Sequence, residues 1–221
     1  MAVSGLLVSV GASAGQLAAF SLGDTSAHVS VHSRERRFPV AKDIEKRLER
    51  LATELGTPDV PHVDYYHYES ASDIAAITGY FVDGVTFANV HQVHSTNDAT
   101  DHELVHILTE QLGHPGTFFQ EGLAVALGNR GRLHGHNVDD VARRAASGIP
   151  VSALIARFDT IDPEKGYSIA GSFVKFLIKR HGVDTVARFF HACSGQPTAT
   201  AFTAVFGSSL DAEGAAWARQ L

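Results

Sequence analysis

The sequence predicts an α+β protein, in which a small mixed α/β part is followed by a mostly helical part. Before about residue 95, short β-branched segments alternate with helical patterns, whereas every apolar pattern after Asn97 has the helical period. The chain has 221 residues, of which 44% are hydrophobic, so it can bury a core. No repeat or Pro/Ser-rich linker separates the two parts, and we expect 1–221 to form one unit with sub-domains 1–95 and 96–221.

The first part is expected to alternate strands with helices. Strands are expected at 28–32, 62–68 and 80–89, the last as one strand or as two that turn at Asp83-Gly84. Helices are expected at 39–55 and 72–78. The longer helix has an apolar stripe that includes Ile44 and Leu48, and Gly56 followed by Pro58 ends it.

Helices account for almost all of the second part. Their patterns fall at 98–112, 117–129, 138–147, 167–181, 184–193, 198–206 and 211–220. Asn97 or Asp98 can cap the first of these helices, and Thr117 with Gln120 forms a capping box for the second.

Charge and cysteine content exclude several classes of function. The formal net charge is −6 and the charges are spread along the chain, so there is no basic stripe that would bind a nucleic acid. No apolar stretch approaches the roughly 20 residues that a transmembrane helix needs. Cys193 is the only cysteine, which excludes an internal disulfide and a zinc site built from thiolates. Metal ligands must therefore be histidines and carboxylates.

The first fifteen residues allow two interpretations. Leu6 to Val10 is a short apolar run, and Ala12-Ser13-Ala14 resembles the cleavage site of a signal peptide, which would indicate a secreted or extracytoplasmic protein. No Lys or Arg precedes the run, as a signal peptide requires. The other interpretation is an ordinary first strand.

The residues with a chemical signature lie at 102–106, where His-Glu-Leu-Val-His matches the pattern H-E-x-x-H. Histidines at i and i+4 lie one above the other on a helix, so both imidazoles can reach one tetrahedral zinc ion at about 2.0–2.1 Å. The glutamate beside the first histidine then faces the activated water as a general base. The pattern predicts His102 and His106 as ligands of one Zn²⁺ ion and Glu103 as the base.

A catalytic zinc site needs a third protein ligand and an open fourth position. Glu121 lies in the first turn of the next expected helix, and the turn at 113–116 brings that helix back toward the histidine pair. His114 is a competing third ligand, although it lies in a turn rather than on a helix face. A metzincin site is excluded, because Thr109 and Leu112 stand where it requires Gly and His.

These residues give the chain a resemblance to a known family. H-E-x-x-H followed by Glu121-Gly122-Leu123-Ala124 resembles the bacterial peptidase MA-like domains, relatives of the gluzincins. Further segments match in the family's order over residues 27 to 221, at 167–177, His181-Gly182, 206–210 and Trp217. The gap between His106 and Glu121 is shorter than in thermolysin-like members, and Gln120 stands where those often have Asn.

The resemblance implies a zincin-like fold and a zinc-dependent peptidase. It implies that an edge strand, assigned to Val85–Val90, lies beside the active-site helix and binds the backbone of a peptide or protein substrate by strand addition. Tyr167 would donate a hydrogen bond to the developing oxyanion, although an aromatic residue at a helix start is as often a packing residue. No G-x-M-E-N motif occurs at 80–89, so we expect an endopeptidase rather than an aminopeptidase.

Other histidines and a second class of function stay open. His91 and His94 could orient a ligand, but are predicted as loop histidines, and 134–140 resembles a metal-binding loop but is predicted as a solvated one. The alternative to hydrolysis is a zinc-binding interaction module without turnover. The intact Glu103 favours hydrolysis, because degenerate members of the family usually lose this residue first.

Overall fold

The structure is a computed structural model that describes residues 3–8, 20–34, 39–57, 59–195 and 197–221. Contacts divide it into two compact units, Met1–Gln111 and Leu112–Leu221. The first unit combines strands with helices and the second is mostly helical, which confirms the α+β class. The division lies after Gln111 rather than near residue 95, because the helix that carries the histidine pair packs on the strands.

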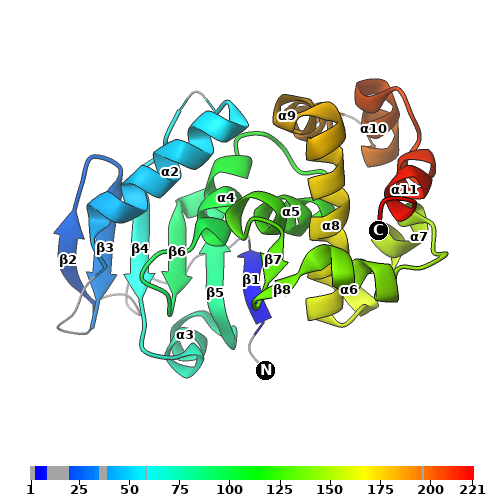
Figure 1. Ribbon diagram of the computed structural model, residues 1–221. Helices are drawn as coiled ribbons and strands as arrows, with labels where there is room; N and C mark the ends of the chain where they lie inside the picture. Colours follow the sequence, from blue (N-terminus) through cyan, green and yellow to red (C-terminus); the bar gives the residue numbers. More distant parts are fainter. Residues whose placement is uncertain (1–2, 9–19, 35–38, 58, 196) are drawn as a thin grey trace. The chain divides into compact units, whose positions relative to one another are not determined.

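A sheet of six strands forms the first unit within the described residues, in the order β1-β5-β6-β4-β3-β2. The strands, seen side by side in Figure 1, are β1 (Val3–Val8), β2 (Ser21–Thr25), β3 (Val29–Ser33), β4 (Val63–His67), β5 (Val82–Phe87) and β6 (Gln92–Ser95). The pairs β3/β4, β4/β6 and β1/β5 are parallel, whereas β5 is antiparallel to β6 and β2 is antiparallel to β3. Valine and tyrosine recur in β3 and β4, because such side chains fit a pleated surface that is at least half buried.

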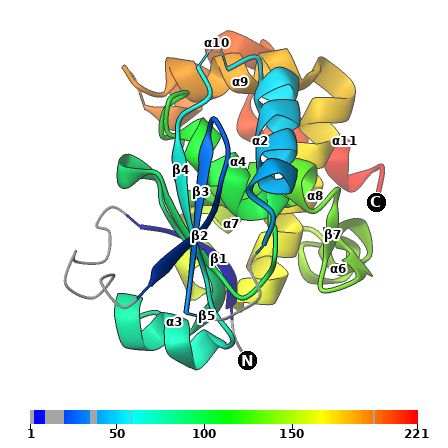
Figure 2. The same cartoon turned by 90° about the vertical axis from the view of Figure 1, so that its left-hand side faces the viewer.

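Helices pack on both faces of this sheet, with α3 on the part formed by β5 and β6. Within the described residues the helices of the first unit are α2 (Ala41–Leu55), α3 (Ala71–Thr78) and α4 (Asp101–Thr109). Successive side chains of a strand point to opposite faces, so Thr86 of β5 faces α4 while Val85 and Phe87 pack with Ile74 of α3. α2 and α4 pack together on the Thr86 side, as Figure 2 shows. The helix with the histidine pair is therefore fixed on the sheet beside β5.

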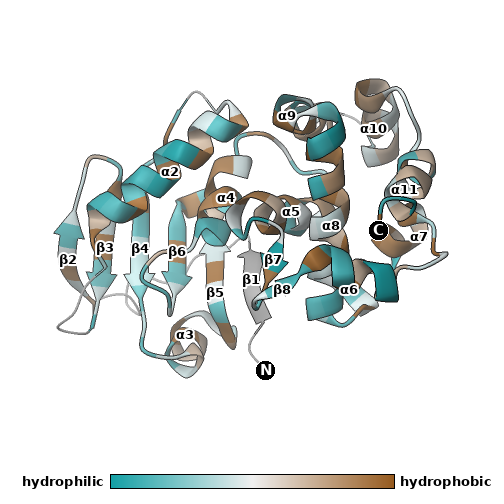
Figure 3. Cartoon of the chain, viewed as in Figure 1, coloured by the Kyte–Doolittle hydropathy of each residue, from teal (hydrophilic) through white to brown (hydrophobic). Residues whose placement is uncertain are grey.

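The longest helix of this unit follows its sequence pattern closely. The buried residues of α2 recur every three or four positions, at Ala41, Ile44, Glu45, Leu48, Leu51, Ala52 and Leu55. Polar residues predominate on the side of α2 that is seen in Figure 3. The helix ends at Gly56, whose φ of 66° is left-handed, which confirms the predicted stop.

Of the two interpretations of 80–89, the single strand is confirmed and the turn at Asp83-Gly84 is wrong. β5 runs through both residues without a turn, and Gly84 is paired with Ser95 of β6. β6 was not predicted, because its four residues include His94, which interrupts the apolar alternation of a strand. The prediction of His94 as a loop histidine is therefore also wrong, whereas His91 follows the 3₁₀ turn that precedes β6.

The strand beside α4 is not an edge of the sheet. β5 ends at Phe87 and Ala88–Val90 form a 3₁₀ turn, so the predicted edge strand at Val85–Val90 is only half extended. The side of β5 away from β6 is paired with β1. Part of the signal-like apolar run, Leu6 to Val8, therefore lies in a strand, while Ala12-Ser13-Ala14 lies outside the described residues.

The second unit is built on one long helix. Its elements are α5 (Thr117–Leu123), a π-helical segment (Ala124–Gly128), the hairpin β7 (Arg132–Leu133) and β8 (His136–Asn137), α6 (Val138–Ala145), α7 (Val151–Ala156), a 3₁₀ turn (Phe158–Thr160), α8 (Pro163–His181), α9 (Val183–Ala192), α10 (Thr198–Phe206) and α11 (Leu210–Ala218). α8 contacts α5, α6, α9 and α11. The loop predicted at 134–140 is instead the end of this hairpin and the start of α6.

The core of this unit is aromatic. Five rings pack against one another in edge-to-face, tilted or stacked pairs and belong to Phe118, Phe119, Phe173, Phe189 and Phe202. They come from α5, α8, α9 and α10, and each ring is at least 98% buried. Aromatic pairs of this geometry add to the free energy of folding beyond the area that they bury. The position of α5 is therefore set by two of its own residues, Phe118 and Phe119.

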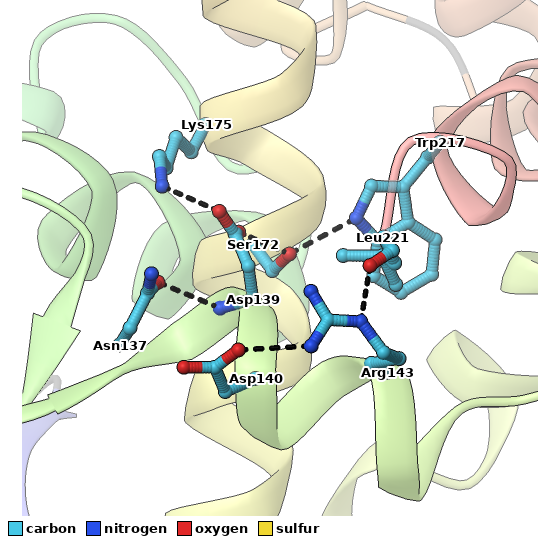
Figure 4. Close-up of polar contacts among 8 residues, drawn as sticks. All are labelled: Asn137, Asp139, Asp140, Arg143, Ser172, Lys175, Trp217 and Leu221. Carbon is cyan, nitrogen blue, oxygen red and sulfur yellow. Dashed lines mark hydrogen bonds and ion pairs between the residues drawn. The ribbon is translucent and has the colours of Figure 1, made fainter.

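A polar network joins α6 and α11 to α8, as Figure 4 shows. Ser172 of α8 donates a hydrogen bond to Asp139 Oδ1 over 2.8 Å and accepts one from Trp217 Nε1 over 3.0 Å. Lys175 pairs with the other carboxylate oxygen of Asp139 at 2.6 Å. Arg143 donates to the carbonyl of Leu221, the last residue of the chain. These bonds explain why Ser172, although polar, is buried.

Two helices of the second unit differ from the prediction. α7 was missed, because its six residues are too few to show a helical period. α8 begins at Pro163 rather than at 167, since Asp162 accepts a hydrogen bond from the backbone N–H of Lys165 and Pro163 takes the first position. No helix within the described residues has the length and apolar character needed to span a membrane.

Candidate metal centre

The helix α4 is buried along its whole length and is anchored at its first residue. Asp101 accepts hydrogen bonds from Arg47 Nη1 at 2.9 Å and from Arg50 Nη2 at 2.6 Å, both on α2. A carboxylate at this end also interacts favourably with the positive end of the helix dipole. The predicted caps Asn97 and Asp98 are not used, since α4 starts after Thr100 without a side-chain cap. The two arginines therefore fix where the histidine pair begins.

The two histidines lie on the same face of α4, as the spacing predicts. The ring centroids of His102 and His106 are 5.0 Å apart and the rings are nearly perpendicular, at 79°. The exposed fractions are 3% for His102 and 0% for His106. Burial of two polar rings on one helix face costs free energy unless each ring has a hydrogen-bond partner or binds a metal ion.

Glu103 is held from the sheet. Thr86 of β5 donates a hydrogen bond from Oγ1 to Glu103 Oε2 over 2.7 Å, and the same hydroxyl is 3.2 Å from the backbone carbonyl of Glu103. The other carboxylate oxygen, Oε1, lies against Gly84, where an added Cβ would be only 2.6 Å from it. A glycine and a threonine on one strand thus define the position of this carboxylate. Glu103 as a whole is 2% exposed.

The segment that leads into α4 is also tied to the sheet. Tyr65 of β4 donates a hydrogen bond to the carbonyl of Asn97 over 2.7 Å, and the backbone N–H of Thr96 donates to the carbonyl of Asp83. Burial raises the pKa of Tyr65 far above its usual value, so the phenol keeps its proton and stays a donor.

Glu121 lies in α5 and is completely buried. The helix starts at Thr117 after Gly116, and no side chain caps it, so the predicted capping box of Thr117 and Gln120 is wrong. Gly122 makes the close contact between α5 and α8, because an added Cβ there would be 2.8 Å from the carbonyl oxygen of Ala170. This contact and the aromatic core fix the rotation of α5 and hence the direction of Glu121.

One ligand atom from each of His102, His106 and Glu121 lies within 4.8 Å of the other two. All three residues are buried, and together they could hold a metal ion. The donor set is two imidazoles and one carboxylate. Ligands of a tetrahedral zinc ion lie roughly 3.4 Å from one another, given bond lengths of about 2.0–2.1 Å, and this spacing is within the observed limit.

A second group of possible ligands consists of His28, Glu45 and Glu49. Glu45 Oε1 already accepts a hydrogen bond from the backbone N–H of His28 over 2.8 Å, which joins α2 to the start of β3. Glu49 is exposed, and exposed carboxylates commonly gather without a metal. This group is therefore interpreted as part of the fold.

The other predicted site residues have different surroundings. His114 is exposed, and its Nδ1 is 3.2 Å from Gln120 Nε2. Tyr167 lies in α8, is 8% exposed and stacks on Phe158, with centroids 6.1 Å apart and an interplanar angle of 17°. Its packing role is evident from this contact, and its role at an oxyanion stays a prediction.

Sequence reasoning missed the residues that position the site. Thr86, Gly84 and Asp101 support the candidate base and the helix that carries it, but each is ordinary in type and stands far from its partner in the chain. The one available signal was Gly84 inside a β-branched segment, since an isolated glycine in a strand often marks a close approach. It was interpreted as a turn.

Comparison with family models, with curated proteins and with solved structures finds no match for this chain. The resemblance to peptidase MA-like domains therefore rests on the residues that carry it.

Proposed function

We propose that this protein is a zinc-dependent endopeptidase, related to the peptidase MA-like domains, in which His102, His106 and Glu121 hold one zinc ion. The observation that carries the proposal is the buried group of two imidazoles and one carboxylate within 4.8 Å. Three protein ligands of this kind leave one position for water or substrate, as catalytic zinc sites do. Nitrogen and oxygen donors in this ratio suit zinc better than magnesium or calcium, which prefer oxygen.

The placement of Glu103 supports hydrolysis over metal storage. The residue follows a ligand directly, and its carboxylate is oriented by Thr86 and limited by Gly84. A bound zinc ion would polarise a scissile carbonyl and make water acidic enough to lose a proton near neutral pH. Glu103 accepts that proton and then delivers it to the leaving amine. Tyr167 is proposed as the donor to the oxyanion.

The central test compares Glu103→Gln with the unaltered protein. Glutamine keeps the size and the polar contacts of the side chain but cannot take a proton, so we expect hydrolysis of fluorescein-labelled casein to fall roughly 10²–10⁴-fold. Zinc content, measured by mass spectrometry on the purified protein, should stay at one ion per chain. Glu69→Gln removes an exposed carboxylate and serves as the matched control, with activity and zinc unchanged.

The outcomes separate hydrolysis from the interaction-module alternative. Casein cleavage that is lost with 1,10-phenanthroline and restored by zinc, and that needs Glu103, supports the peptidase. One tightly bound zinc without cleavage of any protein substrate supports a binding module instead. Absence of stoichiometric zinc in a protein refolded with the metal contradicts both.

A further inference from the structure

The outer side of β5 is occupied by a segment from the start of the chain. β1 lies beside β5 in Figure 1, parallel to it, with Ser4 paired to Gly84 and Leu7 to Thr86. The register shifts twice within this short pairing, whereas β5 and β6 pair without any shift. β1 is therefore joined less regularly than the neighbours on the other side of β5.

The residues of β5 that contact the candidate base lie in the segment that pairs with β1. Gly84 contacts the Glu103 carboxylate and Thr86 donates a hydrogen bond to it, and these are two of the four residues to which β1 pairs. α4 also contacts β1. A chain that pairs with this edge of β5 therefore lies next to the helix that carries Glu103.

The side of a strand binds an extended chain through backbone hydrogen bonds, whatever the sequence of that chain. Two exposed apolar side chains flank β5, because Phe81 before it is 57% exposed and Val90 after it is 45% exposed. β1 itself has the sequence Val-Ser-Gly-Leu-Leu-Val, without a charge or a proline. This segment has the composition of an extended apolar peptide.

We propose that β1 occupies in cis the site at which an extended, apolar peptide segment of a substrate adds to β5. Residues 3–8 then act as an internal inhibitor, and substrate binds when they leave β5. The inhibitory role of residues 3–8 rests on the proposed peptidase function. The exchange of one strand for another is a binding event, however, and can be measured without catalysis.

A reversible tether gives the first test. Val3 and Val82 are paired across the two strands, and backbone positions in adjacent strands are close enough for a disulfide. The full chain with Val3→Cys, Val82→Cys and Cys193→Ser is compared in its oxidised and reduced forms. The probe is a fluorescein-labelled peptide with the sequence of residues 2–10, followed by fluorescence anisotropy. We expect the oxidised form to bind it at least about 10-fold more weakly than the reduced form.

Proline substitution gives the second test. Ser4→Pro with Leu7→Pro removes the backbone N–H donors of two residues that are paired with Gly84 and Thr86 of β5. Ser4→Ala with Leu7→Ala is the matched control, since it changes the same side chains and keeps both donors. The proline variant should bind the labelled peptide at least about 10-fold more tightly than the control and should cleave casein faster.

The outcomes distinguish this inference from the proposed function. Tighter peptide binding by the proline variant without cleavage by any form supports strand exchange and contradicts the peptidase. Equal peptide binding by the oxidised and reduced forms overturns the inference, and so does failure of the disulfide to form. If the proline variant unfolds, as circular dichroism would show, β1 is a structural strand and the inference fails, whether or not the unaltered protein is active.

Discussion

His94 and His106 are both completely buried in the first unit, yet their neighbours give them different chemistry. His106 shares a helix face with His102 and lies within ligand distance of Glu121. His94 lies in β6 among aromatic rings, stacked on Tyr66 with centroids 4.8 Å apart, and its Nδ1 shares a 2.6 Å hydrogen bond with the Tyr68 hydroxyl. Burial alone therefore does not mark a metal ligand.

The surroundings of His106 and His94 differ in the presence of a carboxylate, because Glu121 lies within ligand distance of His106. Burial lowers the pKa of His94 to about 3, with a smaller contribution from nearby His32, so the ring stays neutral. The described residues form no group of possible metal ligands that includes His94. We expect His94 to affect the stability of the fold and the pair on α4 to affect metal binding.

The largest expected effect is on zinc affinity. His106→Ala and Glu121→Ala each remove one of three proposed ligands, and zinc affinity should fall by more than about 100-fold, because even partners outside the ligand set commonly contribute 10- to 100-fold. Competition with a chromophoric chelator measures this. His94→Gln is the matched buried control. A loss of zinc in that variant as large as in His106→Ala would contradict the assignment of His94 to the core and of His106 to the metal site.

The next largest effect is expected at Gly84. An alanine Cβ there would be 2.6 Å from Glu103 Oε1, so the carboxylate must move. Because a displacement of about 1 Å can cost roughly 10²-fold in rate, kcat for casein should fall by that order while zinc content stays at one per chain. Gly195→Ala places a methyl in open space at a position without a left-handed φ and controls for the added group. Unchanged kcat in Gly84→Ala would show that this strand does not position the base.

A smaller effect is expected at Thr86. Thr86→Val keeps the shape of the side chain and removes the donor to Glu103 Oε2. A hydrogen bond to a charged group contributes about 1.5–3 kcal/mol, so we expect a loss of kcat of roughly 10- to 100-fold. The carboxylate also loses a donor that stabilises its charge, which should shift the acidic limb of the pH profile upward. Thr86→Ser, which restores the hydroxyl, should restore both kcat and the profile; a loss there equal to that of Thr86→Val would contradict the role of the bond.

The last expected effect concerns stability rather than activity, and it is the pH dependence of unfolding that comes from His94. Its folded pKa of about 3 is lower than the unfolded value of about 6.5, so the unfolded chain binds more protons as the pH falls between these values. The free energy of unfolding is thus highest above about pH 6.5 and falls toward pH 3, by at most about 1.4 kcal/mol per pH unit from this residue. Urea denaturation of His94→Gln should show a shallower decline between pH 6.5 and 4.5.

The control for that experiment is His91→Gln, which changes a half-exposed histidine in the same segment. Its decline with pH should match that of the unaltered protein. Equal slopes for all three proteins would mean that His94 is protonated in the folded state, and the contrast with the α4 histidines would lose its basis.

Local patterns predicted the elements well where one periodicity extends over several turns. α2, α9 and α10 lie within a few residues of their expected positions, because each has an apolar stripe long enough to be recognised. α7 and β6 were missed, since six and four residues do not show a period. The start of α8 was placed late because Asp162 and Pro163 were not recognised as its cap and first residue.

The candidate ligands could be proposed from sequence because they follow local rules. His102 and His106 share a face through the helical repeat, and Glu121 follows after one short turn. The residues around them could not be proposed in this way. Thr86 and Gly84 come from a strand that is adjacent in space but distant along the chain, and nothing in their identity points to Glu103.

By itself the sequence determined the α+β class, the histidine pair with its glutamates, and the exclusion of an internal disulfide and of a zinc site built from thiolates, because each follows from residue type or from spacing within one or two turns. The tertiary structure alone decided that β5 runs through Asp83-Gly84, that His94 is a neutral core residue, and that β1 covers the strand beside Glu103. These depend on which segments pair across the sheet. Strand pairing is a long-range choice, fixed by the burial of whole faces rather than by any local pattern.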